Sequence, residues 1–143
     1  MAAVEAELWP WVGYSMYSGH SLSGDELRTL RALLSSQSAA DVRQMMAEDI
    51  YDGMLPLHAV ACDADKKGEY ALPFFEAVFN AHPKAAAKSG GGFLPLHLVA
   101  LRWGSSPAEG LRAMQMLLNA HPKAAEAEDR FGSLPLHLVA HYW

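Results

Sequence analysis

The 143-residue chain is poor in cysteine, in clustered positive charge and in long apolar runs. Its single cysteine, Cys62, cannot form an internal disulfide, so packing must supply the stability and a reducing compartment is expected. Lys and Arg total 11 against 16 Asp and Glu, with a formal net charge of -5 and no dense basic block. A nucleic-acid partner is therefore not expected, because binding to phosphates needs a concentrated basic surface.

Membrane and targeting segments are not indicated either. No stretch approaches the roughly 20 apolar residues that a membrane-spanning helix needs. Glu5 and Glu7 lie near the start, with no cationic segment before an apolar run, so neither a secretory nor a mitochondrial leader is expected. We expect a cytosolic or nuclear protein with one domain, because 143 residues is an ordinary length for one domain.

An internal repeat is the strongest feature of the sequence. The phrase Leu-Pro-Leu-His begins at Leu55, Leu94 and Leu134, at spacings of 39 and 40 residues, and a glycine stands two residues before each. A second phrase, Asn-Ala-His-Pro-Lys-Ala-Ala, occurs at 80–86 and again at 119–125. Two phrases that recur in step indicate a tandem array of structural units.

An amphipathic helix is predicted between the two phrases of each unit. Its apolar residues follow the spacing i, i+3, i+6, i+7, which places them on one helical stripe. They are Leu72, Phe75, Val78 and Phe79 in one unit, and Leu111, Met114, Leu117 and Leu118 in the next. The same spacing in Leu27, Leu30, Leu33 and Leu34 predicts a further helix near 24–34.

Capping residues mark the helix starts. Ser106 offers a hydroxyl at the N-cap, Pro107 suits the first helical position and Glu109 can return a hydrogen bond to the cap. The segment 23–26 has the same pattern.

The long helix of the middle unit is expected to start differently from that of the next unit and to end in the same way. It has Lys67 at the cap position and Pro73 further in, so that helix is expected to begin about one turn later. Pro83 and Pro122 should stop the long helices, because the residue before a proline is disfavoured in the helical region. Each proline can then start a short turn through Lys-Ala-Ala.

Each unit is thus a short helix beginning at Pro-Leu-His, a connection, a longer amphipathic helix and a turn. One such pair cannot cover its own apolar face, so units must stack. We expect one domain over 1–143, an all-α solenoid of about three to three and a half units. Its parts are a degenerate N-terminal repeat or cap at 1–49, repeats at 50–88 and 89–128, and a partial repeat at 129–143.

These phrases resemble the ankyrin repeat, whose first helix opens with Gly-x-Thr-Pro-Leu-His-Leu-Ala-Ala after an Asp-x-x-Gly turn. Residues 129–132, Asp-Arg-Phe-Gly, match that turn, and the resemblance covers 50–143 well and 8–49 weakly. The period of about 40 exceeds the usual 33. Leu55, Leu94 and Leu134 replace the family's Thr, so the hydroxyl bond of the usual turn is absent.

The motif histidines, His58, His97 and His137, are the obvious candidate metal ligands. Equivalent positions in adjacent units lie about 8–10 Å apart, whereas a zinc ligand nitrogen lies about 2.0–2.1 Å from the ion. The three histidines are therefore not expected to share an ion. The resemblance implies that this histidine bonds backbone groups of the turns, so we expect a structural role, with no metal and no cofactor.

A hydrolase is the enzymatic alternative. Residues 19–24 resemble the Gly-x-Ser-x-Gly elbow, with His20 and Ser21 as the candidate reactive residues, but the second glycine comes one residue late. The elbow also needs a preceding strand, and none is indicated. Ser23 as an N-cap explains the segment better, and Gly90 to Gly92 lack the Lys and Ser/Thr of a phosphate-binding loop. We expect no catalytic residues.

The resemblance implies a non-catalytic scaffold that binds a partner protein through the turn tips and the outward positions of the first helices. The alternative is a structural subunit or fragment of a larger ankyrin-repeat assembly. The positions that the resemblance assigns to the partner surface are Tyr51, Asp52, Met54, Cys62, Asp63, Gly90, Gly91, Phe93, Leu101, Arg102, Arg130, Phe131, Ser133, His141 and Tyr142.

Overall fold

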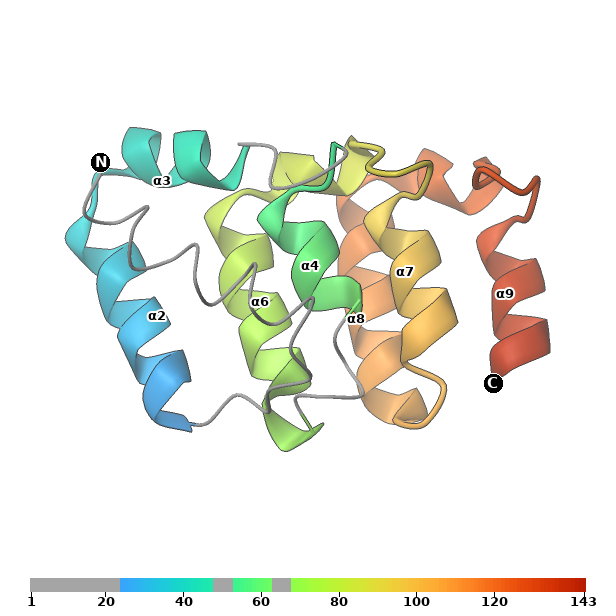
Figure 1. Ribbon diagram of the computed structural model, residues 1–143, viewed down its shortest axis with the longest axis horizontal. Coiled ribbons are helices and arrows are strands. Elements are labelled where there is room, and N and C mark those ends of the chain that lie inside the picture. The colour runs from blue at the N-terminus through green and yellow to red at the C-terminus, as the bar shows by residue number, and fades with distance from the viewer. Residues whose placement is uncertain (1–23, 48–52, 63–67) are drawn as a thin grey trace.

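The computed structural model describes residues 24–47, 53–62 and 68–143, and all regular secondary structure within them is helical (Figure 1). Backbone pairing of the β type between these residues is limited to an isolated bridge that joins Gly90 to Phe93. The all-α class expected from the sequence is therefore confirmed for this part of the chain. None of its helices combines the length and apolar character needed to cross a membrane.

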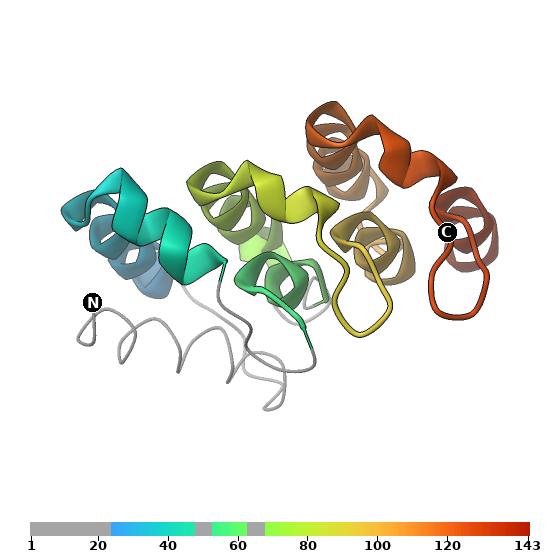
Figure 2. The ribbon, with the colours of Figure 1, turned by 90° about the horizontal axis from the view of Figure 1, so that it is seen from above.

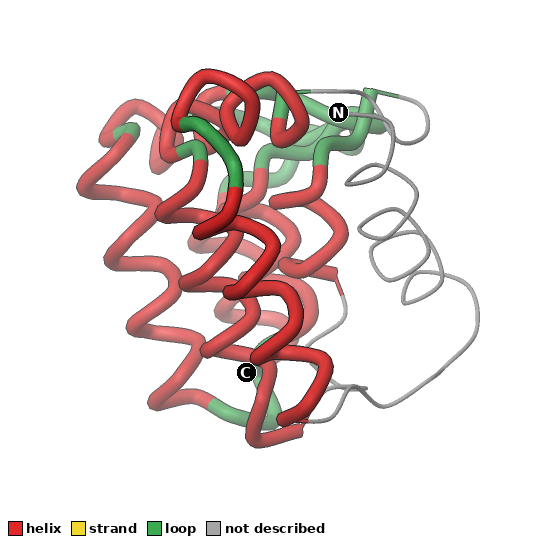
Figure 3. The backbone as a smooth tube through the Cα atoms, turned by 90° about the vertical axis from the view of Figure 1, so that its left-hand side faces the viewer, coloured by secondary structure: helices red, strands yellow, loops and turns green. Residues whose placement is uncertain are grey.

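The helices form two rows. The elements in chain order are α2 (Gly24–Ser36), α3 (Ala39–Met46), α4 (Pro56–Cys62), the 3-10 turn η1 (Gly68–Tyr70), α6 (Ala71–Ala81), η2 (Pro83–Ala87), α7 (Pro95–Arg102), α8 (Pro107–Ala120), η3 (Pro122–Glu126) and α9 (Pro135–Tyr142). The short helices α4, α7 and α9 lie side by side in one row, and α2, α6 and α8 lie in the other (Figures 1 and 2). The view from the side in Figure 3 shows the two rows as separate layers.

The core lies between the two rows. The short helices bury their Leu and Val residues almost completely, with Leu57, Leu96 and Val99 at 1%, 2% and 0% exposure. The long helices contribute Phe75 at 0% and Leu117 at 1%. Removal of this apolar surface from water is the main stabilising contribution.

The ends of the long helices agree with the sequence. Helices α6 and α8 end at Ala81 and Ala120, directly before the His-Pro pairs, and η2 and η3 begin at the prolines. Helix α6 begins three residues later in its unit than α8, after the 3-10 turn η1, which confirms the delayed start expected from Pro73. Helix α2 confirms the helix predicted near 24–34.

Three details differ from the sequence-based expectation. Ser106 is the N-cap of α8 but its side chain makes no capping hydrogen bond, because its ψ of 68° departs from the extended backbone that capping needs. Helix α3 was not expected, and its N-cap Ser38 accepts a hydrogen bond from the backbone of Asp41 over 3.1 Å. Leu111, predicted for the buried stripe, is 60% exposed, since α8 is the last long helix of its row in the described structure.

Candidate partner-binding surface at the turn tips

Two motif histidines link the start of a short helix to a turn 30 residues further along the chain. In His58, Nδ1 accepts a hydrogen bond from the Leu55 N–H at 2.9 Å, and Nε2 donates to the Lys88 carbonyl at 2.8 Å. His97 repeats the pattern, accepting from Leu94 at 3.0 Å and donating to the Ala127 carbonyl at 2.9 Å. Both imidazoles are fully buried, and with both ring nitrogens in use they join one unit to its closing turn.

The electrostatics of His58 favour its neutral form. Burial lowers the pKa of His58 below its usual value, and backbone hydrogen bonding at Lys88 and Phe93 raises it in part. Protonation of Nδ1 would also remove the acceptor for the Leu55 N–H. Among the described residues, no three His, Cys, Asp or Glu side chains are grouped so that they could hold a metal ion.

The third motif histidine, His137, has a different environment. Its Nδ1 accepts from the Leu134 N–H at 3.1 Å, as in the other units, but the side chain is exposed. Its Nε2 has no hydrogen-bond partner within the described part of the chain.

Two tryptophans form a second link between units, which was not predicted from the sequence. The indole of Trp103 donates to the carbonyl of Ala61 at 2.8 Å, and Trp143 donates to Ala100 at the same distance. Their positions, eight residues after Pro95 and Pro135, recur in register with the motif and could have identified them.

The turns before α7 and α9 are held by internal hydrogen bonds. In the first, Gly90 and Phe93 exchange backbone hydrogen bonds of 2.8 and 3.0 Å, and Gly91 and Gly92 adopt positive φ. In the second, the buried Asp129 accepts bonds at Oδ1 from the Phe131 N–H (2.8 Å) and from Ser133. Each tip therefore has a defined backbone conformation.

The two tips also contact each other. The N–H of Arg130 donates to the Gly92 carbonyl at 2.9 Å, and the rings of Phe93 and Phe131 have centroids 6.0 Å apart. The guanidinium carbon of Arg130 lies 5.4 Å from the Phe131 centroid, a cation-π arrangement. Phe131 is 76% exposed. We call Phe93, Arg130 and Phe131 the aromatic-arginine patch.

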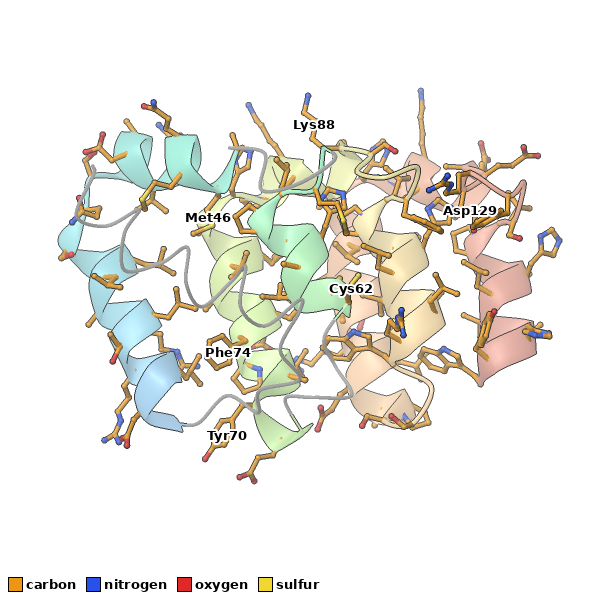
Figure 4. The ribbon with its side chains drawn as sticks, in the orientation of Figure 1. Met46, Cys62, Tyr70, Phe74, Lys88 and Asp129 are labelled. Atoms are coloured by element: carbon orange, nitrogen blue, oxygen red, sulfur yellow. The ribbon has the colours of Figure 1, made fainter. Side chains whose placement is uncertain are left out.

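The residues assigned to a partner surface from the sequence fall into two groups. Met54, Gly91, Phe93, Arg130, Phe131 and Ser133 belong to the turn tips, and Cys62, Leu101, Arg102, His141 and Tyr142 lie at the ends of the short helices. In Figure 4, Asp129 at the turn tips lies near the top of the molecule and Cys62 lies lower, at the far end of α4. The two predicted sets, the turn tips and the first-helix positions, thus lie at opposite ends of the short helices.

Some assigned residues do not contribute exposed surface, and others are outside the described structure. Gly90 is buried, because Gly53 and Met54 pack against its backbone: a Cβ there would lie 2.8 Å from Gly53 O. Gly90 therefore joins two turns instead of facing a partner. Tyr51, Asp52 and Asp63 lie outside the described residues, as does the candidate hydrolase segment 19–24 apart from Gly24, the first residue of α2.

No protein-family model, no curated protein and no solved structure matches this chain.

Proposed function

We propose that the chain is an ankyrin-like stack of helix pairs that acts as a non-catalytic protein-binding module, with the aromatic-arginine patch as its main contact. The stack is supported by the recurrence of the same helix pair, histidine bond and turn in successive units. Such a stack presents its turn tips in a row, next to the short helices (Figure 2).

The exposure of Phe131 is the observation that carries the proposal. A large aromatic ring that is 76% exposed contributes little to folding, yet it lies beside a second ring and a guanidinium. Aromatic and Arg side chains dominate the binding free energy of many protein interfaces. A cluster of these types at a loop tip favours a role in recognition.

The rigidity of the tip adds to this argument. Asp129 fixes the backbone on both sides of Phe131, and Arg130 is bonded to the neighbouring turn through Gly92. A surface already held in one conformation loses little entropy on association. The partner that suits it offers an apolar pocket for Phe131 and a carboxylate for Arg130.

Quantitative affinity capture from the native cell extract tests the proposal. The bait carries Arg130→Ala and Phe131→Ala together, and the matched control carries Arg102→Ala and Tyr142→Ala, which change the same residue class at the helix ends. We expect the turn-tip variant to lose at least about tenfold of any protein that the wild-type chain enriches, since two anchors of about 1–2 kcal/mol each are removed. Equal recovery with both variants, or loss only with the control, would contradict the proposal.

A further inference from the structure

A groove lies between α2 and α6, two neighbours in the row of long helices (Figure 2). We call it the α2–α6 groove. It is lined by the C-terminal half of α2, by α3, by α6 and by Pro83 at the start of η2. Its volume of about 730 Å³ is within the range of about 300–1,000 Å³ that is typical of ligand-binding sites. None of the residues of the aromatic-arginine patch lines it.

Small side chains account for the space in this groove. Leu34 on α2 and Ala77 on α6 both line it. The register of the apolar stripe and of the Asn-Ala-His-Pro phrase makes Phe79 and Met116 their equivalents between α6 and α8. Both equivalents are larger, and both pack in or against the core. The groove therefore follows from two positions at which the first pair of long helices has less side-chain volume than the next pair.

The groove has positive charge without a counter-ion. Arg31 on α2 and Arg43 on α3 line it and are exposed, and neither guanidinium has an ion pair or a hydrogen bond with a described residue. Glu76 is the acidic residue among the described residues of the lining, but its Oε1 already accepts a hydrogen bond from Nε of Arg112 at 3.1 Å. Two cations are thus left free in a chain whose formal net charge is -5.

Further cations lie close to Arg43. The pKa of His82 is lowered mainly by burial and to a smaller extent by the positive charges of Lys84, Arg43 and Lys88. The three cations therefore lie near the same imidazole. Like charges held near one another repel, and a bound anion relieves this repulsion.

We propose that the α2–α6 groove binds an acidic segment of a partner protein, in which two Asp or Glu side chains pair with Arg31 and Arg43. Guanidinium groups bind carboxylates through strong, paired hydrogen bonds. The lining also includes Val42 and Ala77, which suit an apolar side chain of the segment, and Asn80, which offers a donor and an acceptor to its peptide groups. A simple inorganic anion would use only the two cations. This site is separate from the turn tips and does not depend on their proposed function.

Selection of short random peptides displayed on phage against the 143-residue chain identifies the class of ligand. Peptides that also bind the double variant Arg31→Ala, Arg43→Ala are removed first. Both arginines are exposed and unpaired with described residues, so the double variant should fold, which circular dichroism checks. We expect the enriched peptides to carry two or more acidic residues next to an apolar one.

Fluorescence anisotropy of a labelled, selected peptide then measures the effect of charge in the groove. Arg31→Ala and Arg43→Ala should each weaken binding at least about fivefold, since each removes a charge-assisted hydrogen bond. Arg28→Ala is the matched control on α2, because this side chain pairs with Asp25 and does not line the groove. It should leave the affinity unchanged. Glu76→Gln should tighten binding, because it removes a carboxylate from the lining.

Two further variants test the shape and the location of the site. Ala77→Met gives α6 the residue that α8 has at the equivalent position, and it should abolish binding because the longer side chain occupies the groove. Phe131→Ala should leave the affinity unchanged, which separates this site from the turn-tip function.

Four results would overturn the proposal. One is the recovery of no peptide after the removal step, and the second is a set of enriched peptides without acidic residues. The third is full displacement of the peptide by millimolar inorganic phosphate at constant ionic strength, with Ala77→Met binding as the wild type does, which would indicate a site for a simple anion. The fourth is sedimentation showing that the wild-type chain dimerises and that the double variant does not, because a second copy would then occupy the groove.

Discussion

The Nε2 atom of His97 lies 2.9 Å from the carbonyl oxygen of Ala127, and His58 stands in the same relation to Lys88 at 2.8 Å. Both bonds span 30 residues and join the start of a short helix to the turn that closes the same unit. The Leu-Pro-Leu-His phrase therefore specifies more than a helix start, because its histidine also fixes where the chain returns after the long helix.

The same substitution in two units should have unequal effects. His97→Ala removes both hydrogen bonds and leaves the buried Leu94 N–H and Ala127 carbonyl unsatisfied, so we expect a loss of about 2–5 kcal/mol in the free energy of unfolding. His137→Ala removes one exposed bond and should cost less than about 1 kcal/mol. Urea unfolding followed by circular dichroism measures both free energies. Equal losses in the two variants would contradict a larger contribution from the hydrogen bonds of His97 than from that of His137.

Stability should fall as the solution is acidified below about pH 6.5. Burial lowers the pKa of His58 in the folded chain, so the unfolded chain binds the proton first as pH falls. The stabilisation from this histidine is present above its unfolded pKa and is lost as pH drops through the folded one. The urea midpoint at pH 5.5 should therefore be lower than at pH 7.5.

His82 should contribute to the same decline. The pKa of His82 is lowered mainly by burial and to a smaller extent by the positive charges of Lys84, Arg43 and Lys88. Its Nδ1 atom is buried and has no hydrogen-bond partner. The variant His82→Gln should show a smaller difference between pH 7.5 and pH 5.5 than the wild-type chain. Replacing the exposed Gln115 by Asn, which changes no titrating group, is the control and should leave the difference unchanged. A larger effect from Gln115→Asn than from His82→Gln would contradict this assignment.

Repeated phrases and local backbone preferences predicted most of the helix pattern, whereas contacts between units were missed, including the recurring tryptophan links. Register and period located the short helices, the ends of the long helices at Pro83 and Pro122, and the turn after each proline, because local backbone preferences decide them. Helix α3 was missed because its unit lacks the motif. The exposure of Leu111 was missed because a stripe shows which residues share a face, and only the neighbouring helices decide whether that face is covered.

The residues of the candidate surface could be predicted from the sequence, but the contacts between them could not. The resemblance assigned Phe93 and Phe131 to the turns, but the contact between their rings depends on the Arg130 to Gly92 hydrogen bond, which joins two turns. The burial of Gly90 likewise comes from the backbone of residues 53 and 54, far away in sequence. Such contacts between units are set by tertiary packing.

Two glycines of the turns allow the inter-turn contact to be tested. Gly92 has φ +87°, and a Cβ there would lie 2.5 Å from Cβ of Arg130, whereas Gly132 has φ +80° with no atom within 4 Å. Gly132→Ala should cost about 1 kcal/mol from backbone strain, and Gly92→Ala should cost at least about 2 kcal/mol because Arg130 must also move. Thermal unfolding of the two variants measures the difference, and equal losses would show that the turns do not pack as described.

The tryptophan links should also contribute to stability. Trp143→Phe keeps an aromatic ring but removes the indole donor from the carbonyl of the buried Ala100, so a cost of about 1–2 kcal/mol is expected. Trp103→Phe should cost more, because Trp103 is fully buried and also packs edge-on against Phe75 at 5.7 Å. Chemical unfolding compares them, and a Trp143 variant as stable as the wild type would argue against this bond.

The most direct test of the central claim, that the turn tips bind a partner protein, is site-specific photo-crosslinking. A photoreactive phenylalanine analogue is placed at position 131 and, in a matched chain, at the exposed position 115 on α8, and both are irradiated in the native cell extract. We expect one dominant protein adduct from position 131 that is absent from position 115 and disappears when Arg130 is replaced by Ala. The absence of a specific adduct at 131, or the same adduct from both positions, would contradict it.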